Sequence, residues 1–285
     1  MTGIFKKISI IFAVSIVMGY INNSYAQKEQ ITINYDTVLT PRTKIIKIVR
    51  VKTVPKFVLH VNGSYSFGAM ELTGHNGGFN RLDIIQGKNF GARHGFGFNI
   101  IGKLPLTKKG DLWLDFITGY DRFQSDLVTN NTQEGKSSYN SYNGGVGIEY
   151  DLTSYHKLKY YVGFNPLLSV ITGKVSLINP DNNRIDINIK SSVRLGYSAF
   201  VGFEYAIEKD FGVNLSLKFT HANLLLKNSE AAVEEPDATS TIPLNDNAGD
   251  PDIQFSAWKQ FAYFSGSVGF SYFFGVKERK YKVPQ

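Results

Sequence analysis

The stretch Phe264-Ser-Gly-Ser-Val-Gly-Phe-Ser-Tyr-Phe-Phe274 decides the fold. Its even positions are mostly large and apolar, whereas its odd positions are mostly Ser or Gly. Because successive side chains of a β-strand point to opposite faces, this stretch predicts a strand with one apolar face. Similar alternation recurs along the chain behind an export signal, which is the sequence pattern of a transmembrane β-barrel.

The N-terminus has the three parts of a secretory signal peptide. Two lysines precede an apolar run at 8–18, and the small residues Ser24 and Ala26 frame a cleavage site before Gln27. The run is shorter than the ~20 residues of a membrane-spanning helix, so we expect residues 1–26 to be removed rather than to stay as an anchor. No later stretch is long and apolar enough for a helix, so a membrane-embedded form must use strands.

Composition excludes several classes of site and partner. Cysteine is absent, which excludes disulfides, thiolate metal sites and a lipidated cysteine. The net charge of +7 includes the two signal lysines, and residues 27–56, with seven basic and two acidic residues, hold the rest of the excess. The remaining chain is balanced, so we expect no basic groove and no nucleic acid partner.

Eight segments alternate in this way, each with about the nine or more residues that a tilted strand needs to cross a membrane. They are 57–68, 95–104, 112–120, 142–152, 158–170, 193–205, 211–219 and 264–274. Their connections alternate between short ones at 105–110, 153–157 and 206–210 and long polar ones at 69–94, 124–141, 172–192 and 227–258. Bacterial barrels have short periplasmic turns and longer external loops. We therefore predict an all-β, eight-stranded antiparallel up-and-down transmembrane β-barrel, with both mature termini in the periplasm.

A soluble β-sandwich is the alternative, since alternating strands also build sandwiches. Three features favour the barrel. Gly and Ser dominate many polar faces, the chain's last apolar strand is aromatic, and aromatic residues such as Tyr150, Tyr160 and Tyr205 lie at strand ends, as in an interfacial girdle.

The segment Gly269-Phe-Ser-Tyr272-Phe-Phe274 resembles the C-terminal assembly signal of bacterial outer-membrane barrels, carried by Gly269, Tyr272 and Phe274. Residues 57–274 as a whole resemble the small eight-stranded outer-membrane barrels of Gram-negative bacteria, OmpA/OmpX-like and porin-like. The cleavage site before Gln27 and the stretch 35–38 are similar to exported proteins of the Bacteroidota. The resemblance implies a place in the outer membrane, contact with its lipid and lipopolysaccharide, and insertion by the barrel assembly machinery. The tail 275–285 departs from the pattern, because such proteins often stop at the terminal aromatic.

Charged residues at inward positions predict a network in the lumen. The interior of an eight-stranded barrel is just wide enough for side chains to fill it, and unpaired charges there are costly. We therefore expect pairing and a plugged core, with an ion gate or a proton-coupled element as the functional alternative. The residues are Lys103, Asp115, Glu149, Lys159, Glu204 and Lys218.

Histidines are the test for catalysis, because enzymes of small barrels pair a nucleophile or water with a base near the outer rim. His60 lies two inward steps from Ser64 but at the wrong end of the barrel. His75 and His94 belong to the first external loop, where no motif fixes a nucleophile. His156 lies in a turn and His221 at the top of the seventh strand. We predict no catalytic residue; an enzyme of the loop rim acting on lipid A or phospholipid is the alternative.

The last external loop has no basic residue between Asn228 and Ala257. Its segment Asp246-Asn-Ala-Gly-Asp250-Pro-Asp252 loosely resembles a calcium loop, but it lacks the twelve-residue pattern that ends in Glu. We predict no metal and no cofactor, and a solvated loop held off the anionic lipopolysaccharide surface.

Residues 27–56 form a basic periplasmic arm. From Lys44 onward, basic and β-branched residues alternate imperfectly. The arm could add a strand to a periplasmic protein or lie on anionic headgroups or peptidoglycan, or it could be a linker. The predicted chain thus has four parts: the signal 1–26, the arm 27–56, the barrel 57–274 and the tail 275–285.

We predict a non-enzymatic barrel with surface loops for adhesion or recognition, or with a structural or accessory role in a membrane complex. A narrow passive pore is the remaining alternative.

Overall fold

The computed structural model describes residues 46–73, 89–129, 132–153, 157–178, 184–228, 239–244, 246–247 and 259–284. The chain divides into two compact units, one of residues 55–275 and one that joins residues 1–54 with 276–285. Within the described ranges, no helix has the length and the apolar character needed to cross a membrane.

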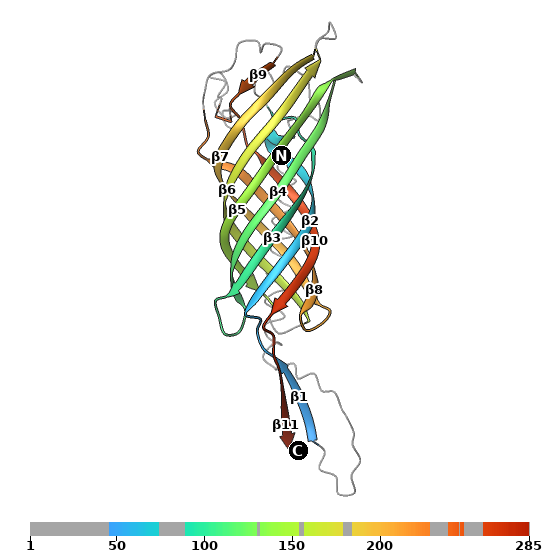
Figure 1. Cartoon of the computed structure of the whole chain (residues 1–285), viewed down its shortest axis with the longest axis vertical. Helices are drawn as coiled ribbons and strands as arrows, with labels where there is room; N and C mark the ends of the chain where they lie inside the picture. Colours follow the sequence, from blue (N-terminus) through green and yellow to red (C-terminus); the bar gives the residue numbers. More distant parts are fainter. Residues whose placement is uncertain are drawn as a thin grey trace, which may run out of the picture. The chain divides into compact units, whose positions relative to one another are not determined.

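The larger unit is a closed antiparallel barrel (Figure 1). One nine-stranded sheet runs in the order β6-β5-β4-β3-β2-β10-β8-β7-β9, and the additional pairing of β6 with β7 closes eight of these strands into a cylinder. All eight predicted strands are present. They are β2 (Phe57–Ala69), β3 (His94–Pro105), β4 (Leu112–Thr129), β5 (Thr132–Asp151), β6 (Leu158–Ile178), β7 (Arg184–Ala206), β8 (Phe211–Leu225) and β10 (Ala262–Phe274).

Short and long connections collect at opposite ends of the barrel. The turn end holds the connections 106–111, 152–157 and 207–210, together with Phe57 and Phe274, where β2 begins and β10 ends. The loop end holds the other connections, including the 3₁₀ turn η1 (Met70–Leu72) and the short strand β9 (Thr239–Ile242), which pairs in parallel with the outer end of β7.

An apolar belt surrounds the barrel because successive residues of each strand point alternately to the outer surface and into the lumen. In β10 the even residues from Phe264 to Phe274 point outward and the odd residues point inward and are buried. Outward apolar side chains remain highly exposed, as at Phe96 (70%) and Val268 (64%). Rings mark both edges of the belt: Tyr65, Phe67, Phe98, Tyr142 and Phe264 toward the loop end, and Tyr150, Tyr160, Tyr205, Tyr272 and Phe274 toward the turn end.

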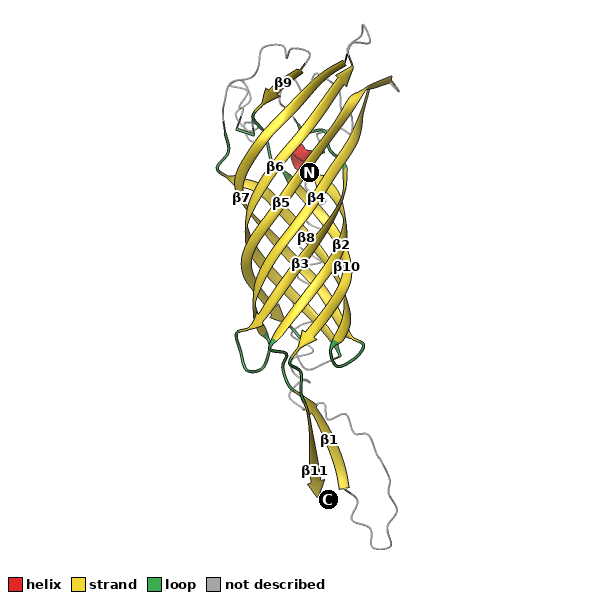
Figure 2. Cartoon of the chain, in the orientation of Figure 1, coloured by secondary structure: helices red, strands yellow, loops and turns green. Residues whose placement is uncertain are grey.

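Strands β4 to β7 run further than predicted. Most of 124–141 and 172–192, which we expected to be long loops, is strand, so β4 and β5 are joined across residues 130–131 and β6 and β7 across residues 179–183. In Figures 1 and 2 these strands rise beyond the other strands of the barrel. We call this four-stranded extension the wall.

The two faces of the strands exchange character where the wall begins. On β4 the inward residues change from polar Asp115 to apolar Phe123 and Leu127, while the outward residues change from Phe116 to Gln124. A bulge at residues 190–191 of β7 changes which positions point inward, so Ile187 faces the same interior as Arg194. The wall is therefore apolar inside and polar outside, as in a water-soluble sheet.

The second unit contains a two-stranded ribbon. β1 (Ile46–Lys52) pairs antiparallel with β11 (Glu278–Pro284), with Ile46 opposite Pro284 and Lys52 opposite Glu278. The arm and the tail, which are far apart in the sequence, thus meet in one sheet.

Candidate functional site

The turn end of the lumen holds a buried network of charges. Each of its members lies within four residues of the turn end of its own strand, so the strand ends bring them to one level. Lys103 Nζ donates to both carboxylate oxygens of Glu149, at 2.6 and 2.7 Å. Glu204 lies 2.6 Å from His60 Nε2 and 3.3 Å from Lys159 Nζ. The pairing of these charges offsets their desolvation.

Aromatic side chains surround the cations of this network. Lys103 Nζ lies 4.5 Å from the centre of the Tyr161 ring, and Lys159 Nζ lies 5.7 Å from that of Trp113. Trp113 Nε1 in turn donates to Asp151 Oδ2 at 3.0 Å, and Lys159 Nζ is 3.8 Å from the same oxygen. Ring faces attract cations, so these contacts add to the ion pairs.

The predicted lumen residues are only partly brought together. Lys103, Glu149, Lys159 and Glu204 share the network, whereas Lys218 is the eighth residue of β8 and lies opposite Phe200 and Ser265. No ion pair of Lys218 occurs in the described part of the chain. Asp115 is fully buried opposite Lys103 in the register, but neither of its carboxylate oxygens has a hydrogen-bond partner among the described residues.

Sequence reasoning missed four members of the network: His60, Asp151, Trp113 and Tyr161. The parity of each strand could have found Asp151 and Trp113, since they continue the inward rows of Glu149 and Asp115. The sequence places His60 two inward steps from Ser64, but in the structure its partner is Glu204, 144 residues away in the sequence. That pairing depends on how the barrel closes.

A layer of hydrogen-bonded polar side chains lies in the middle of the lumen. Asp121 accepts hydrogen bonds from Tyr263 Oη at 2.8 Å and from Ser66 Oγ at 3.1 Å. Asn143 Nδ2 donates to the same tyrosine oxygen at 3.0 Å, and Ser66 and Ser265 hydroxyls are 2.8 Å apart. The bonds of Tyr263 with Asp121 and Asn143 cross the lumen from β10 to β4 and β5, so they hold distant strands of the barrel together.

An apolar cluster fills the lumen at the loop end. Phe261 is fully buried at its centre, with ring centres 5.4 Å from Phe90, 5.7 Å from Phe123 and 5.9 Å from Tyr139. The wall contributes buried aliphatic side chains to the same cluster: Leu127, Ile171, Val175, Leu177 and Ile187. Residues 89–92 and 259–262, which we expected in external loops or at their edges, supply part of this core.

Asp246 fastens the last loop to the barrel. Its carboxylate accepts two hydrogen bonds of 2.8 Å from the Arg194 guanidinium, one of 2.8 Å from Asn223 Nδ2 and one of 3.2 Å from the Asn228 amide. Burial alone would raise the pKa of Asp246, but these donors outweigh burial and hold the pKa below its usual range. Asp246 is therefore part of an ion pair and does not stand free as a calcium ligand; Asp250 and Asp252 lie outside the described residues.

Lys259 is buried beside this contact. Lys259 Nζ lies 5.3 Å from the centre of the Phe90 ring. Burial lowers the pKa of Lys259 to about 8, although the Asp246 carboxylate opposes the shift. We call Arg194, Asn223, Asp246 and Lys259 the loop lock.

The described histidines lie in different parts of the barrel, and His60 pairs with Glu204 in the charged network. His94 packs beside the rings of Tyr65, at 6.1 Å, and Phe67, at 5.9 Å. Its ring makes no hydrogen bond to a serine or a carboxylate among these residues. His221 is buried beside Tyr197, whereas His75 and His156 lie outside the described residues. The described residues also contain no group of three or more acidic or histidine side chains placed to hold a metal ion.

The residues of the predicted assembly signal lie on β10, the last strand of the barrel, which pairs with the first, β2. Tyr272 and Phe274 point outward with ring centres 4.6 Å apart, and Phe274 contacts Phe57 of β2. Gly269 points inward against β2, where a Cβ atom would lie 2.7 Å from Asn62 Cα and closer still to the Val61 carbonyl. Recognition by the assembly machinery stays a prediction.

Comparison with known proteins gives similarity of fold at low identity. No protein-family model and no curated protein matches the chain. Neisserial surface protein A is 13% identical, with a TM-score of 0.41 over 77% of this chain and 97% of that chain. The outer membrane protein OprG from Pseudomonas aeruginosa is 8% identical, with a TM-score of 0.41 over 81% and 98%. The attachment invasion locus protein Ail of Yersinia pestis is 9% identical, with a TM-score of 0.36 over 77% and 98%.

Proposed function

We propose that this chain is a non-enzymatic outer-membrane barrel with a filled lumen, whose loop end faces outward as a recognition surface. The observation that carries the proposal is the exchange of faces along β4 to β7. An outer face of exposed rings and aliphatic side chains requires hydrocarbon, whereas the wall beyond it is polar outside and requires water.

The wall supports a role in recognition because it is built rigidly. Its inner face packs on the apolar cluster, and its outer face carries exposed ion pairs, such as Lys174 with Asp186 at 2.9 Å and Lys136 with Asp126 at 3.5 Å. Neighbouring strands bond along its length, so a partner would meet a preformed surface and little ordering entropy would oppose binding.

Cysteine labelling tests the membrane placement, because the chain has no cysteine of its own. We would introduce Gln124→Cys on the wall, Lys108→Cys in a turn of the turn end and Val268→Cys in the belt; all three positions are exposed. A membrane-impermeant maleimide applied to whole cells should label Q124C at once and K108C only after the outer membrane is permeabilised.

V268C should resist the reagent in both conditions and react after the protein is extracted and unfolded. Labelling of K108C on intact cells with protection of Q124C would reverse the proposed orientation. Rapid labelling of V268C in intact membranes would contradict a hydrocarbon-facing belt. Pull-down through a label on Q124C then identifies the partner of the outer surface.

The ribbon supports a second role, docking to an anionic periplasmic surface such as peptidoglycan. Residues 27–56 hold seven basic and two acidic residues, and 275–285 add four basic and one acidic. The register places Arg50 opposite Lys280. Both strands are rich in basic residues and an isolated two-stranded ribbon is marginal in water, so an anionic partner would stabilise this one.

Sedimentation with purified peptidoglycan sacculi tests this docking. The folded protein in detergent should co-sediment, and the double variant Arg50→Gln/Lys280→Gln should bind more weakly. The double variant Lys108→Gln/Lys109→Gln, which removes two charges from a barrel turn, is the matched control. Equal sedimentation of all three proteins would reject the ribbon as the docking element.

A further inference from the structure

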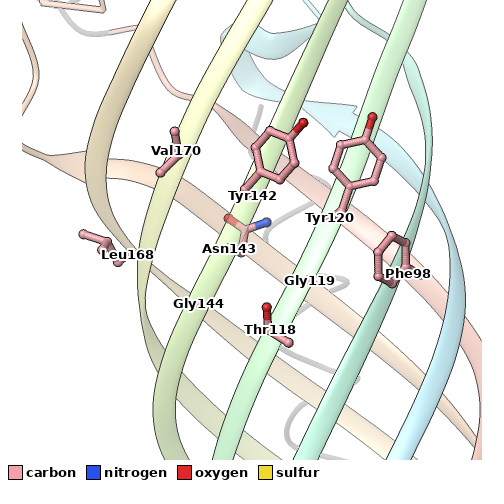
Figure 3. Close-up of a pocket in the computed structure, with 9 residues that line it drawn as sticks. All are labelled: Phe98, Thr118, Gly119, Tyr120, Tyr142, Asn143, Gly144, Leu168 and Val170. Atoms are coloured by element: carbon pink, nitrogen blue, oxygen red, sulfur yellow. The ribbon is translucent and has the colours of Figure 1, made fainter.

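A groove of about 630 Å³ lies on the outer surface of the barrel, within the apolar belt (Figure 3). Strands β3, β4, β5 and β6 form it, and its lining is mostly apolar, with polar groups from Asn143 and the hydroxyls of Thr118, Tyr120 and Tyr142. The outward side chains around it are Phe98, Thr118, Tyr120, Tyr142, Leu168 and Val170.

A missing side chain creates the groove. Gly144 lies opposite both Thr118 of β4 and Leu168 of β6, and a Cβ atom built on it would meet nothing within 4 Å. One row nearer the loop end, the rings of Phe98, Tyr120 and Tyr142 stand side by side, with centres 5.9 and 5.0 Å apart. A hollow thus lies directly below a rigid aromatic edge, as Figure 3 shows.

Arg122, a cation with no acidic partner among the described residues, lies beyond this edge toward the loop end. Arg122 is the next outward residue of β4 after Tyr120, it is exposed, and it lies opposite Asn140. Tyr120 Oη donates to Asn140 Oδ1 at 2.7 Å, which fixes the ring below. Among the described residues no carboxylate pairs with Arg122, whereas the nearby wall lysines Lys136 and Lys174 each have one.

We propose that this groove binds one molecule of lipid A, the phosphorylated and acylated glycolipid of the outer leaflet. One acyl chain occupies the hollow over Gly144, and a phosphate bonds to the Arg122 guanidinium. Arg122 lies four strand residues from Thr118, so about 13 Å along the strand separates the phosphate from the middle of the groove. A single lipid spans that distance, since the headgroup and the upper part of its chain are covalently joined.

The chemistry of the site fits this occupant. A guanidinium presents a planar pair of donors that matches phosphate, and its pairing with an anion is strongest at a partly dry boundary. Phenol rings favour the same boundary between headgroups and hydrocarbon. The choice of lipid A rests on the proposed orientation, in which the loop end faces outward.

Native mass spectrometry of the refolded barrel in mild detergent tests the site, with bis-phosphorylated lipid A as the probe and phosphatidylethanolamine as the comparison lipid. Gly144→Leu fills the groove, and Arg122→Gln removes the charge. Gly63→Leu is the matched control for the first, because Gly63 also points outward from a strand with nothing within 4 Å of its Cβ position. Lys190→Gln, at an exposed cation on β7, is the control for the second.

The wild-type protein, G63L and K190Q should each retain one lipid A in preference to phosphatidylethanolamine. G144L and R122Q should each bind lipid A about tenfold more weakly. In G144L the leucine displaces roughly two methylene groups of the acyl chain from the groove, and in R122Q one charge-assisted contact to the phosphate is lost. Heat-modifiable migration on a denaturing gel confirms that each variant is folded; if G144L does not fold, the comparison of R122Q with K190Q decides alone.

Equal affinities of G144L and G63L would overturn the groove, and equal affinities of R122Q and K190Q would overturn the phosphate contact. Retention of a second protein chain in place of lipid would also overturn the proposal. The cysteine labelling described above is independent of these variants. A correctly oriented barrel with no lipid preference would therefore reject this inference and leave the proposed function standing.

Discussion

Lys103 and Glu149 are the pair on which the turn end of the lumen most depends. Both side chains are at most 3% exposed, and the two hydrogen bonds between them are 2.6 and 2.7 Å long. Removing one partner leaves the other charge buried without compensation, whereas removing both can be almost neutral.

Lys103→Met should therefore lower the free energy of unfolding by about 3–5 kcal/mol, and the double variant Lys103→Met/Glu149→Leu should recover most of that loss. Urea titration of the barrel in lipid vesicles measures both. Lys136→Met is the control, because its pair with Asp126 is exposed and worth less than about 1 kcal/mol. If K103M is no less stable than K136M, the buried pair contributes little to the free energy of unfolding.

Asp246 should make the loop lock sensitive to acid. Because its pKa is lowered in the folded protein, its contribution is fully present above the unfolded value of about 3.9 and is lost as the pH falls through the folded value. Hydrogen exchange followed by mass spectrometry should show constant protection of the Asn228 and Lys259 amides from pH 7 to 5 and a loss of protection below about pH 4.

Asp246→Asn should lower that protection at neutral pH and remove its dependence on acid. Asn keeps the size of the side chain and loses the charge that binds Arg194 in two places. If D246N and the wild-type protein have the same protection factors at both pH values, Asp246 does not fasten the loop.

β10 pairs with both β2 and β8, and two of its glycines differ in the space around them. Gly269 points into the seam with β2, where backbone atoms leave no room for a Cβ, whereas Gly266 points outward into open space. Gly269→Ala should therefore reduce the fraction of chain that refolds into vesicles, and Gly266→Ala should not.

Refolding into vesicles takes place without assembly machinery, and heat-modifiable migration on gels measures its yield. A defect of G269A in this assay is a defect of packing. Normal refolding of G269A, combined with failure to insert in cells, would instead assign Gly269 to the assembly signal alone.

The strands of the belt could be predicted because one physical cause, lipid outside and small residues inside, sets their pattern. In Phe264–Phe274 the rings alternate with Ser and Gly, and the observed β10 contains the whole stretch. The wall could not be predicted in the same way. On β4 from Phe123 and on β5 from Tyr139 toward the loop end, the apolar side chains point inward and the polar ones outward, so the sequence pattern of 124–141 predicts a loop.

The residues of the candidate site that follow from alternation within one strand could be predicted. The contacts that depend on which distant strands and loops meet in the closed barrel could not. Lys103 and Glu149 follow from parity within their own strands. The contact of Arg194 with Asp246 joins a strand to a loop 52 residues away, and His60 meets Glu204 from the other side of the barrel. Lys218 has the correct parity but lies too far from the turn end to join the network.

At the scale of the whole molecule, three layers fill the barrel along its axis. Paired charges lie at the turn end, hydrogen-bonded polar groups in the middle, and aromatic and aliphatic side chains at the loop end. We therefore expect the lumen to offer small solutes little room, and we propose the polar wall, the outer groove and the basic ribbon as the surfaces used for function.

The most direct test of this account is the single-channel conductance of the wild-type barrel in planar lipid bilayers. We predict a silent trace at both polarities, and the same silence for Glu149→Gln, because that change removes a charge without opening any layer. Stable, voltage-independent conductance steps from the folded wild-type protein would contradict the filled lumen and favour a pore.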